Sequence, residues 1–158
     1  MTREGSAHKF EALRERFGAG YDRLVPVTGD LKQPLLGVGK SKISDLKSKI
    51  DHFCHFAAIY DIGASAEAQT ATNIDGTRNA VNLAEALDAK CFQHVSSIAA
   101  GGLYEGTFRE DMFEEAENCQ HSYFSTKHDS EGIEGGKFNV VPVDYVVDAM
   151  DHIAIKKA

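Results

Sequence analysis

The stretch IDHFCHFAAIYD, residues 50–61, is an apolar run that ends in small and polar residues. It predicts a buried strand. A long helix is predicted next, capped by Ser65 and covering roughly residues 66–89. A further strand is predicted within CFQHVSSIAA, residues 91–100. Strands that alternate with helices in this way predict an α/β fold with a parallel sheet.

Four further segments extend the pattern on both sides. KFEALRERFG, residues 9–18, is typical of an amphipathic helix, and the apolar part of RLVPVTGD, residues 23–30, predicts a short strand. A helix is expected across HSYFSTKHDS, residues 121–130. Residues 139–157 predict a short strand followed by a terminal helix. The alternation of strands and helices therefore extends along the whole chain.

Composition narrows the classes of function. The chain has 158 residues, with 42% hydrophobic and 26% charged residues, which is ordinary for one globular domain. A net charge of -7 argues against a nucleic-acid partner, and no apolar run is long enough to predict a membrane span. The N-terminus lacks the apolar core of a signal peptide, and the three cysteines form no CxxC motif. We therefore expect a cytoplasmic protein. The histidines show no metal-site spacing, so no metal is expected.

The ends of the predicted strands carry candidate ligand-binding residues, because ligands of open α/β sheets bind beyond the carboxyl ends of the strands. The Asp30 carboxylate is able to accept hydrogen bonds from an adenine amino group. The small side chains of Ala57 and Ala58 would let a flat ligand approach the backbone. The Ser97 hydroxyl would lie near Tyr123 if both line one crevice. Taken singly, each motif is also explained by turn formation, helix packing or capping.

Tyr123 and Lys127 stand four residues apart, so that a helix would place both on one face. A tyrosine with its usual pKa of about 10 is a poor acid–base catalyst at neutral pH. A lysine one turn away favours the phenolate and lowers that pKa. The pair therefore indicates an acid–base site, and the alternative is an exposed surface pair with no task.

Five short motifs follow one another along the chain at a particular spacing. They are GDL at 29–31, HFAA at 55–58, NIDGT at 73–77, VSS at 95–97 and YFSTK at 123–127. In this order the chain resembles an extended short-chain dehydrogenase/reductase, in the epimerase and acyl-thioester-reductase branch. The resemblance covers about residues 3–127. It implies an α/β fold with a partial Rossmann-type, doubly wound parallel sheet and helices on both faces.

The resemblance also implies catalytic roles. Tyr123 would exchange a proton with the substrate oxygen while hydride moves at the nicotinamide. Ser97 would hydrogen-bond the same oxygen, and Lys127 would also hold the ribose hydroxyls of the cofactor. Asn73 matches the asparagine that these proteins place beneath the site, although an asparagine within a helix also bonds locally.

Cofactor binding is implied for a second set of positions, which are Arg3, Asp30, Leu31, Ala57, Ala58 and Lys127. Arg3 stands where the second strand of the family ends, near the adenine ribose. A guanidinium there suits a 2′-phosphate and favours NADP(H) over NAD(H). The alternative for this residue is a solvated arginine near a frayed terminus.

Two segments of the family pattern have no counterpart in this sequence. The first strand with its glycine-rich loop is not seen, and residues 18–20 are better read as a helix cap and turn. GVGKSK, residues 37–42, imitates the tail of a phosphate-binding loop, but Pro34 stands where that motif needs glycine, so we read it as a polar surface loop. We therefore expect this chain to bind NADP(H) weakly or not at all. A deletion after Lys127 would leave residues 1–132 as a partial dinucleotide-binding domain and residues 133–158 as a remnant of the substrate side.

Two functions remain open at this point. The first is an NAD(P)-dependent oxidoreductase that acts on a small carbonyl, alcohol or thioester-derived substrate through a Ser-Tyr-Lys site. The second is a catalytically inactive fragment, kept as a binding or homo-oligomerising module or without function.

Overall fold

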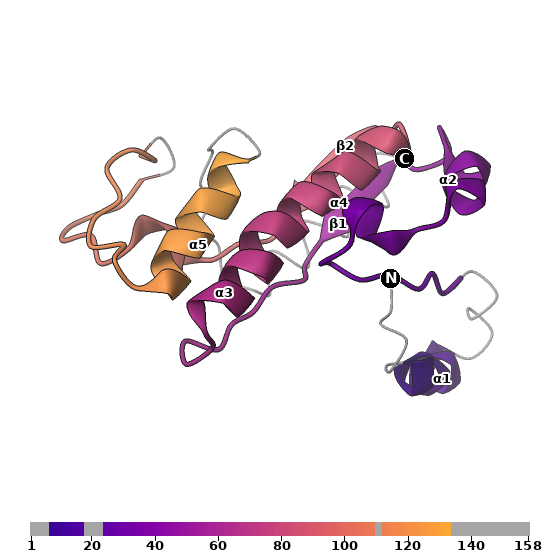
Figure 1. Ribbon diagram of the computed structural model, residues 1–158, viewed down its shortest axis with the longest axis horizontal. Helices are drawn as coiled ribbons and strands as arrows, with labels where there is room; N and C mark the ends of the chain where they lie inside the picture. Colours follow the sequence, from indigo (N-terminus) through magenta and orange to yellow (C-terminus); the bar gives the residue numbers. More distant parts are fainter. Residues whose placement is uncertain (1–6, 18–23, 110–111, 134–158) are drawn as a thin grey trace.

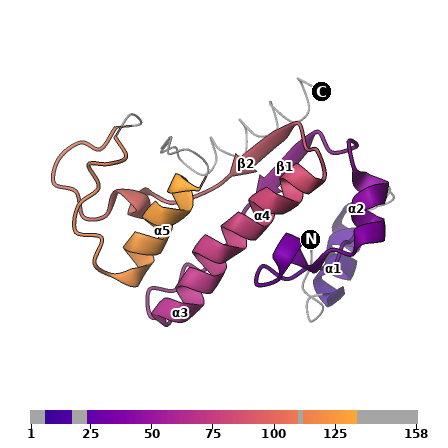
Figure 2. The same cartoon turned by 45° about the horizontal axis from the view of Figure 1, so that its top comes forward.

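The centre of the molecule is a strand–helix–strand unit. The computed structural model describes residues 7–17, 24–109 and 112–133. Strands β1 (His52–His55) and β2 (Cys91–His94) pair in parallel, with Phe53 opposite Phe92. Figure 2 shows the two strands side by side and the long helix α4 running along them. The parallel α/β arrangement that the sequence predicts is therefore confirmed.

The connection between the strands is one continuous helical stretch. It consists of α3 (Ala66–Gln69), the π-helical turn η4 (Thr70–Ile74) and α4 (Asp75–Ala86). The Ser65 hydroxyl accepts a hydrogen bond from the amide of Ala68 at 3.2 Å, as expected for the predicted cap. The π-helical turn was not predicted. Such turns often occur at functional sites.

The core lies between α4 and the two strands. Leu36, Ala80, Leu83 and Leu87 form its buried centre. Phe53 and Phe92 stack against this centre with their ring centroids 5.5 Å apart. The apolar face of α4 is thus covered on one side by the strands and on the other by the segment around Leu36.

The predicted loop at GVGKSK begins a helix instead. The short helix η3 (Pro34–Gly37) is followed by α2 (Lys40–Leu46), whose N-cap is Gly39. The physical reason is that Ile43 and Leu46 pack against the core. The segment therefore gains buried apolar area by forming a helix. The polar-loop prediction was wrong for residues 40–42.

The predicted strand within residues 23–30 is also not formed in the described residues. Only Thr28 makes an isolated bridge. Pro26 has no amide hydrogen to donate to a neighbouring strand. The amide of Asp30 donates to the Leu36 carbonyl at 2.9 Å, so the chain turns back at this point.

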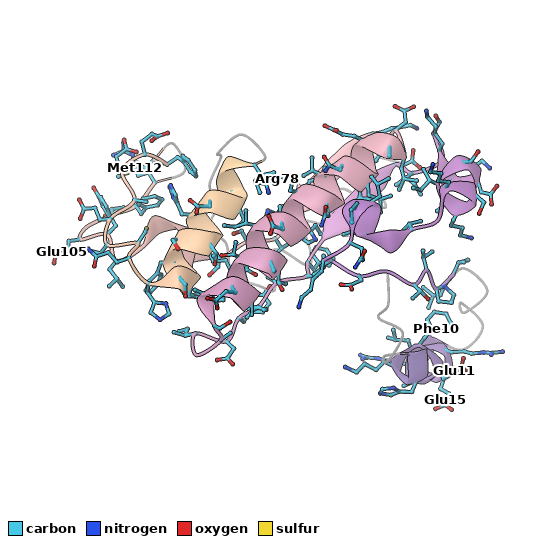
Figure 3. All side chains as sticks on the ribbon, in the orientation of Figure 1. Phe10, Glu11, Glu15, Arg78, Glu105 and Met112 are labelled. Carbon is cyan, nitrogen blue, oxygen red and sulfur yellow. The ribbon has the colours of Figure 1, made fainter. Side chains whose placement is uncertain are left out.

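The second half of the molecule lies at the N-terminal end of α4, next to α3 and η4. The turn η5 (Ile98–Gly101) follows β2 and packs against α5 (Ser122–Gly132). Between them the chain makes a long excursion, residues 103–117, which we call the 103–117 loop. Glu105 and Met112 are carried by this loop, beyond α5 (Figure 3). The helix predicted around residues 121–130 is confirmed by α5.

Helix α1 (Ala7–Phe17) confirms the predicted N-terminal helix. It lies apart from the strand–helix–strand unit, and its residues Phe10, Glu11 and Glu15 are visible in Figure 3 (see also Figure 1). The strand and helix predicted within residues 139–157 fall outside the described residues. None of the described helices is both long and apolar enough to span a membrane.

Candidate active site

Asn73 joins two parts of the candidate site. Its side chain is almost fully buried. The amide oxygen accepts a hydrogen bond from the Ile59 amide at 2.9 Å, and Nδ2 donates to Thr126 Oγ1 at 3.2 Å. Ile59 follows strand β1, and Thr126 lies on α5. Asn73 therefore ties the segment after β1 to the helix that carries Tyr123 and Lys127.

Thr77, which belongs to the same NIDGT motif as Asn73, contacts His55 at the end of β1. Thr77 Oγ1 donates to the Asn73 carbonyl at 2.7 Å and lies 3.1 Å from His55 Nε2. Since the hydroxyl hydrogen is used on Asn73, His55 Nε2 carries the hydrogen and donates to Thr77. Burial, reinforced by the nearby His94 and Lys127, lowers the pKa of His55 to about 4. The imidazole is therefore neutral at physiological pH.

The neutral His55 predicts a loss of stability in mild acid. The unfolded chain takes up a proton near the ordinary pKa of 6.5, whereas the folded chain resists it until about 4. Stability is therefore complete above about pH 6.5 and falls as the pH drops towards about 4. Urea denaturation is expected to show about 2 kcal/mol less stability at about pH 5 than at about pH 7 from this group.

The matched control for this pH effect is a histidine outside the core. His55→Gln should remove most of this pH dependence, whereas His8→Gln, on the exposed face of α1, should leave it unchanged. An unaltered pH profile in His55→Gln would assign the acid sensitivity to other groups.

Lys127 is buried on α5, one turn after the buried Tyr123. Its Nζ lies 4.7 Å from the centre of the Tyr60 ring, a cation–π contact with the segment after β1. Burial lowers the pKa of the Lys127 ammonium, and the nearby Glu131 opposes that shift. The prediction that Tyr123 and Lys127 share a helix is confirmed, and the pair is buried rather than a surface pair.

Ser97 stands at the start of η5, beside α5. Its Oγ accepts a hydrogen bond from the Ala99 amide at 3.2 Å, so the hydroxyl hydrogen is left to donate elsewhere. On α5, His128 Nδ1 donates to the Ala100 carbonyl at 3.1 Å, and its ring stacks on Phe113 at 4.2 Å. These contacts hold the segment that follows Ser97 against the helix of Tyr123.

A pocket of about 540 Å³ runs along strand β1. Asp30, Leu31 and Ala57, three of the residues predicted to bind the cofactor, line it together. Its walls are mainly apolar and include Leu36, Phe53, Leu83 and Leu87. Such a pocket suits a flat, largely apolar group with one polar edge near Asp30.

Asp30 and Leu31 are held in place by the helix beneath them. Asp30 Oδ1 accepts the Lys32 amide at 3.0 Å, a turn contact, so Asp30 also has a structural role. The Leu31 carbonyl accepts a hydrogen bond from Asn79 Nδ2 at 2.9 Å. A side chain at Gly76 would meet Leu31 Cβ at 3.2 Å, so the glycine of NIDGT allows this close approach.

Two of the residues predicted to bind the cofactor, Ala58 and Arg3, are not seen in the pocket lining. Ala58 is half-buried and precedes Ile59, while the pocket lining includes Ala57 and not Ala58. Arg3 lies outside the described residues. In the part of the chain that the structure describes, no cluster of His, Cys, Asp or Glu is arranged to hold a metal ion.

Residue patterns alone missed three members of the site. Thr126 lies inside the YFSTK motif, and Thr77 lies inside NIDGT, so motif membership could have indicated both. Tyr60 follows HFAA by two residues. A lone tyrosine at the end of an apolar run gives no signal by itself that it will contact a lysine far along the chain.

Comparisons with known proteins agree with this geometry. A family model described as "Male sterility protein", an NAD-binding family, matches residues 3–134. A linear gramicidin synthase protein of Brevibacillus parabrevis is 30% identical over 116 residues, covering 70% of this chain and 2% of that protein. The terminal R domain from the myxalamid PKS-NRPS biosynthetic pathway, a solved structure, gives a TM-score of 0.69 at 25% identity and covers 84% of this chain and 36% of that domain.

The parallel strands with their helical crossover, and the pocket that runs along β1, belong to an NAD(P)-binding domain of Rossmann type. The chain belongs to the male sterility family of NAD-binding domains, within the extended short-chain dehydrogenases/reductases. It spans only a part of the length of either relative.

Proposed function

We propose that this chain is an NAD(P)-dependent oxidoreductase domain that acts on a carbonyl, alcohol or thioester-derived substrate through Ser97, Tyr123 and Lys127. The observation that carries the proposal is the burial of Tyr123 and Lys127 one turn apart on α5, with Lys127 reaching the segment after β1. A burial of this kind is costly for an ammonium and is found at functional sites.

The residues of the site fit a nicotinamide dinucleotide. The pocket lined by Asp30, Leu31 and Ala57 would take the adenine end, and Lys127 would hold ribose hydroxyls. When bound, the cofactor supplies or accepts the hydride. We assign NADP(H) rather than NAD(H), on the argument that an arginine at position 3 suits a 2′-phosphate.

The side chains of this chain would handle the proton. In the direction of reduction, Tyr123 donates its phenol hydrogen to the carbonyl oxygen while hydride reaches the carbonyl carbon. Lys127 favours the phenolate that remains. The Ser97 hydroxyl, which has its hydrogen left to donate, binds the same oxygen and orients it.

The order of the motifs favours one part of this substrate range. It resembles the branch of the family that contains acyl-thioester reductases, and the two relatives are named as a synthase subunit and as a domain from a biosynthetic pathway. We therefore propose an acyl thioester as the substrate. Reduction would then release the thiol and leave an aldehyde.

Lys127→Met tests the ribose role, because methionine keeps the apolar stem and removes the charge. A charge-assisted hydrogen bond contributes about 1.5–3 kcal/mol, so affinity for NADPH is expected to fall about tenfold to a hundredfold. Calorimetric titration, with NADPH taken to millimolar concentration because weak binding is expected, measures this change.

The control is Lys90→Met, which removes an exposed lysine paired with Asp51 at 2.7 Å. Its affinity for NADPH should equal that of the unmodified chain. Equal affinity in Lys127→Met would remove Lys127 from the cofactor site. An unmodified chain that binds no NADPH at any concentration reached would contradict the proposed function for this chain.

A further inference from the structure

Tyr60 is a half-exposed residue that touches the buried centre of the site. It is 55% exposed, yet its ring lies over Lys127 Nζ at 4.7 Å. The contact joins the segment after β1 to α5. It brings an aromatic face, which carries partial negative charge, to an ammonium that has lost most of its water.

The residues that precede the two partners of this contact are both hydrogen-bonded to the Asn73 side chain. Asn73 binds the amide of Ile59, which immediately precedes Tyr60, at 2.9 Å. The Nδ2 of the same side chain donates to Thr126 Oγ1 at 3.2 Å. Thr126 immediately precedes Lys127. One buried amide group therefore sets the position of both partners, and the ring is not simply a loose side chain resting on the surface.

We propose that Tyr60 is a positioning residue of the active site, whose ring holds the Lys127 ammonium in place for the proposed reaction. This inference rests on the proposed function. The ring covers one side of the ammonium, so a ligand hydroxyl reaches Lys127 from the sides that the ring leaves open. Tyr60 would in this way shape access to the lysine without touching the reacting atoms.

The groups around Lys127 affect the balance between its charged and neutral forms. Glu131, one turn later on α5, favours the ammonium, whereas burial opposes it. His55 is also close enough to interact with the lysine charge, and Tyr123 precedes it by one turn. The ring adds to the favourable side, because an aromatic face stabilises the charged form and not the neutral amine.

The test measures the titration of Lys127 directly. The protein is methylated with formaldehyde and a hydride reductant at a series of pH values, and labelling of the Lys127 peptide is followed by mass spectrometry. Only the neutral amine reacts, so the midpoint of the profile reports the pKa of Lys127 and is independent of reagent access.

Tyr60→Leu keeps an apolar cover and removes the ring, so the midpoint should fall by about half a pH unit. Tyr60→Phe keeps the ring, and its midpoint should match that of the unmodified chain. Tyr60→Met provides a second ring-free variant in case the first does not fold. Lys9, exposed on α1, serves as the internal reference in every sample.

An unchanged or higher midpoint in both ring-free variants would overturn the proposal, because the ring would then act only by excluding water or not at all. The labelling needs neither cofactor nor substrate. Failure of the proposed function would appear separately, as labelling of Lys127 that saturating NADPH does not change.

Discussion

Tyr123→Phe is expected to lower turnover by about 10²–10⁴-fold while the affinity for NADPH stays within about twofold. The reason is that this change deletes the proton donor alone. Phenylalanine retains the ring of a residue that is buried against Phe124, with ring centroids 5.8 Å apart, so the packing of α5 is preserved. The assay follows NADPH oxidation with a simple acyl thioester and, in parallel, NADPH binding by calorimetry.

Tyr104→Phe is the matched control for this experiment. Tyr104 lies in the 103–117 loop, where its ring packs edge-on against Phe108, and we assign it no chemical role. It should retain full turnover. Activity of Tyr123→Phe within a few-fold of the unmodified chain would remove Tyr123 from the mechanism and, with it, the main argument for the Ser-Tyr-Lys site.

Gly102→Ala is expected to cost about 3 kcal/mol or more of folding free energy. Gly102 has φ 68° and ψ −141°, a backbone conformation that side chains rarely permit. A methyl group there would overlap the carbonyl oxygen of Glu117 and approach Cys119 Sγ to 2.7 Å. The backbone carbonyl cannot move aside without breaking the root of the 103–117 loop. Urea denaturation measures the loss.

Gly39→Ala is the comparison for the glycine variant. Gly39 has φ −63°, and no heavy atom lies within 4 Å of the position that an added methyl group would take, so the change should cost less than about 1 kcal/mol. Equal stabilities of the two variants would show that the segment near Gly102 relaxes freely. The close approach of Gly102 to Glu117 would then contribute little to the free energy of unfolding.

Local patterns were enough to predict the helices that carry Asn73, Tyr123 and Lys127. The long periodic segment after Ser65 and the Tyr123–Lys127 spacing each depend on neighbours along the chain, and the structure confirms both. Asn73 was placed beneath the site by resemblance alone. Its contact with Thr126 spans 53 residues, and no local pattern encodes such a distance.

The errors have a common physical origin. The run at residues 23–30 has strand-like composition, but a strand needs a partner, and the described residues give it only the bridge at Thr28. GVGKSK reads as polar, yet Ile43 and Leu46 just beyond it bury against the core and make a helix of its end. In both cases tertiary contacts outweighed local preference. The NADP(H) preference, which rests on Arg3, and the weak or absent binding of the cofactor remain predictions.

The root of the 103–117 loop has a consequence for how this protein could be diversified. The amide of Leu103 donates to the Glu117 carbonyl at 2.9 Å, so the two ends of the loop meet at one point. Lengthening a loop whose ends already meet costs only about 0.6 kcal/mol for each doubling of its length. The loop is therefore expected to accept new lengths while η5 and α5 keep their places, provided that the buried Met112 and Phe113, which stacks on His128 of α5, are retained.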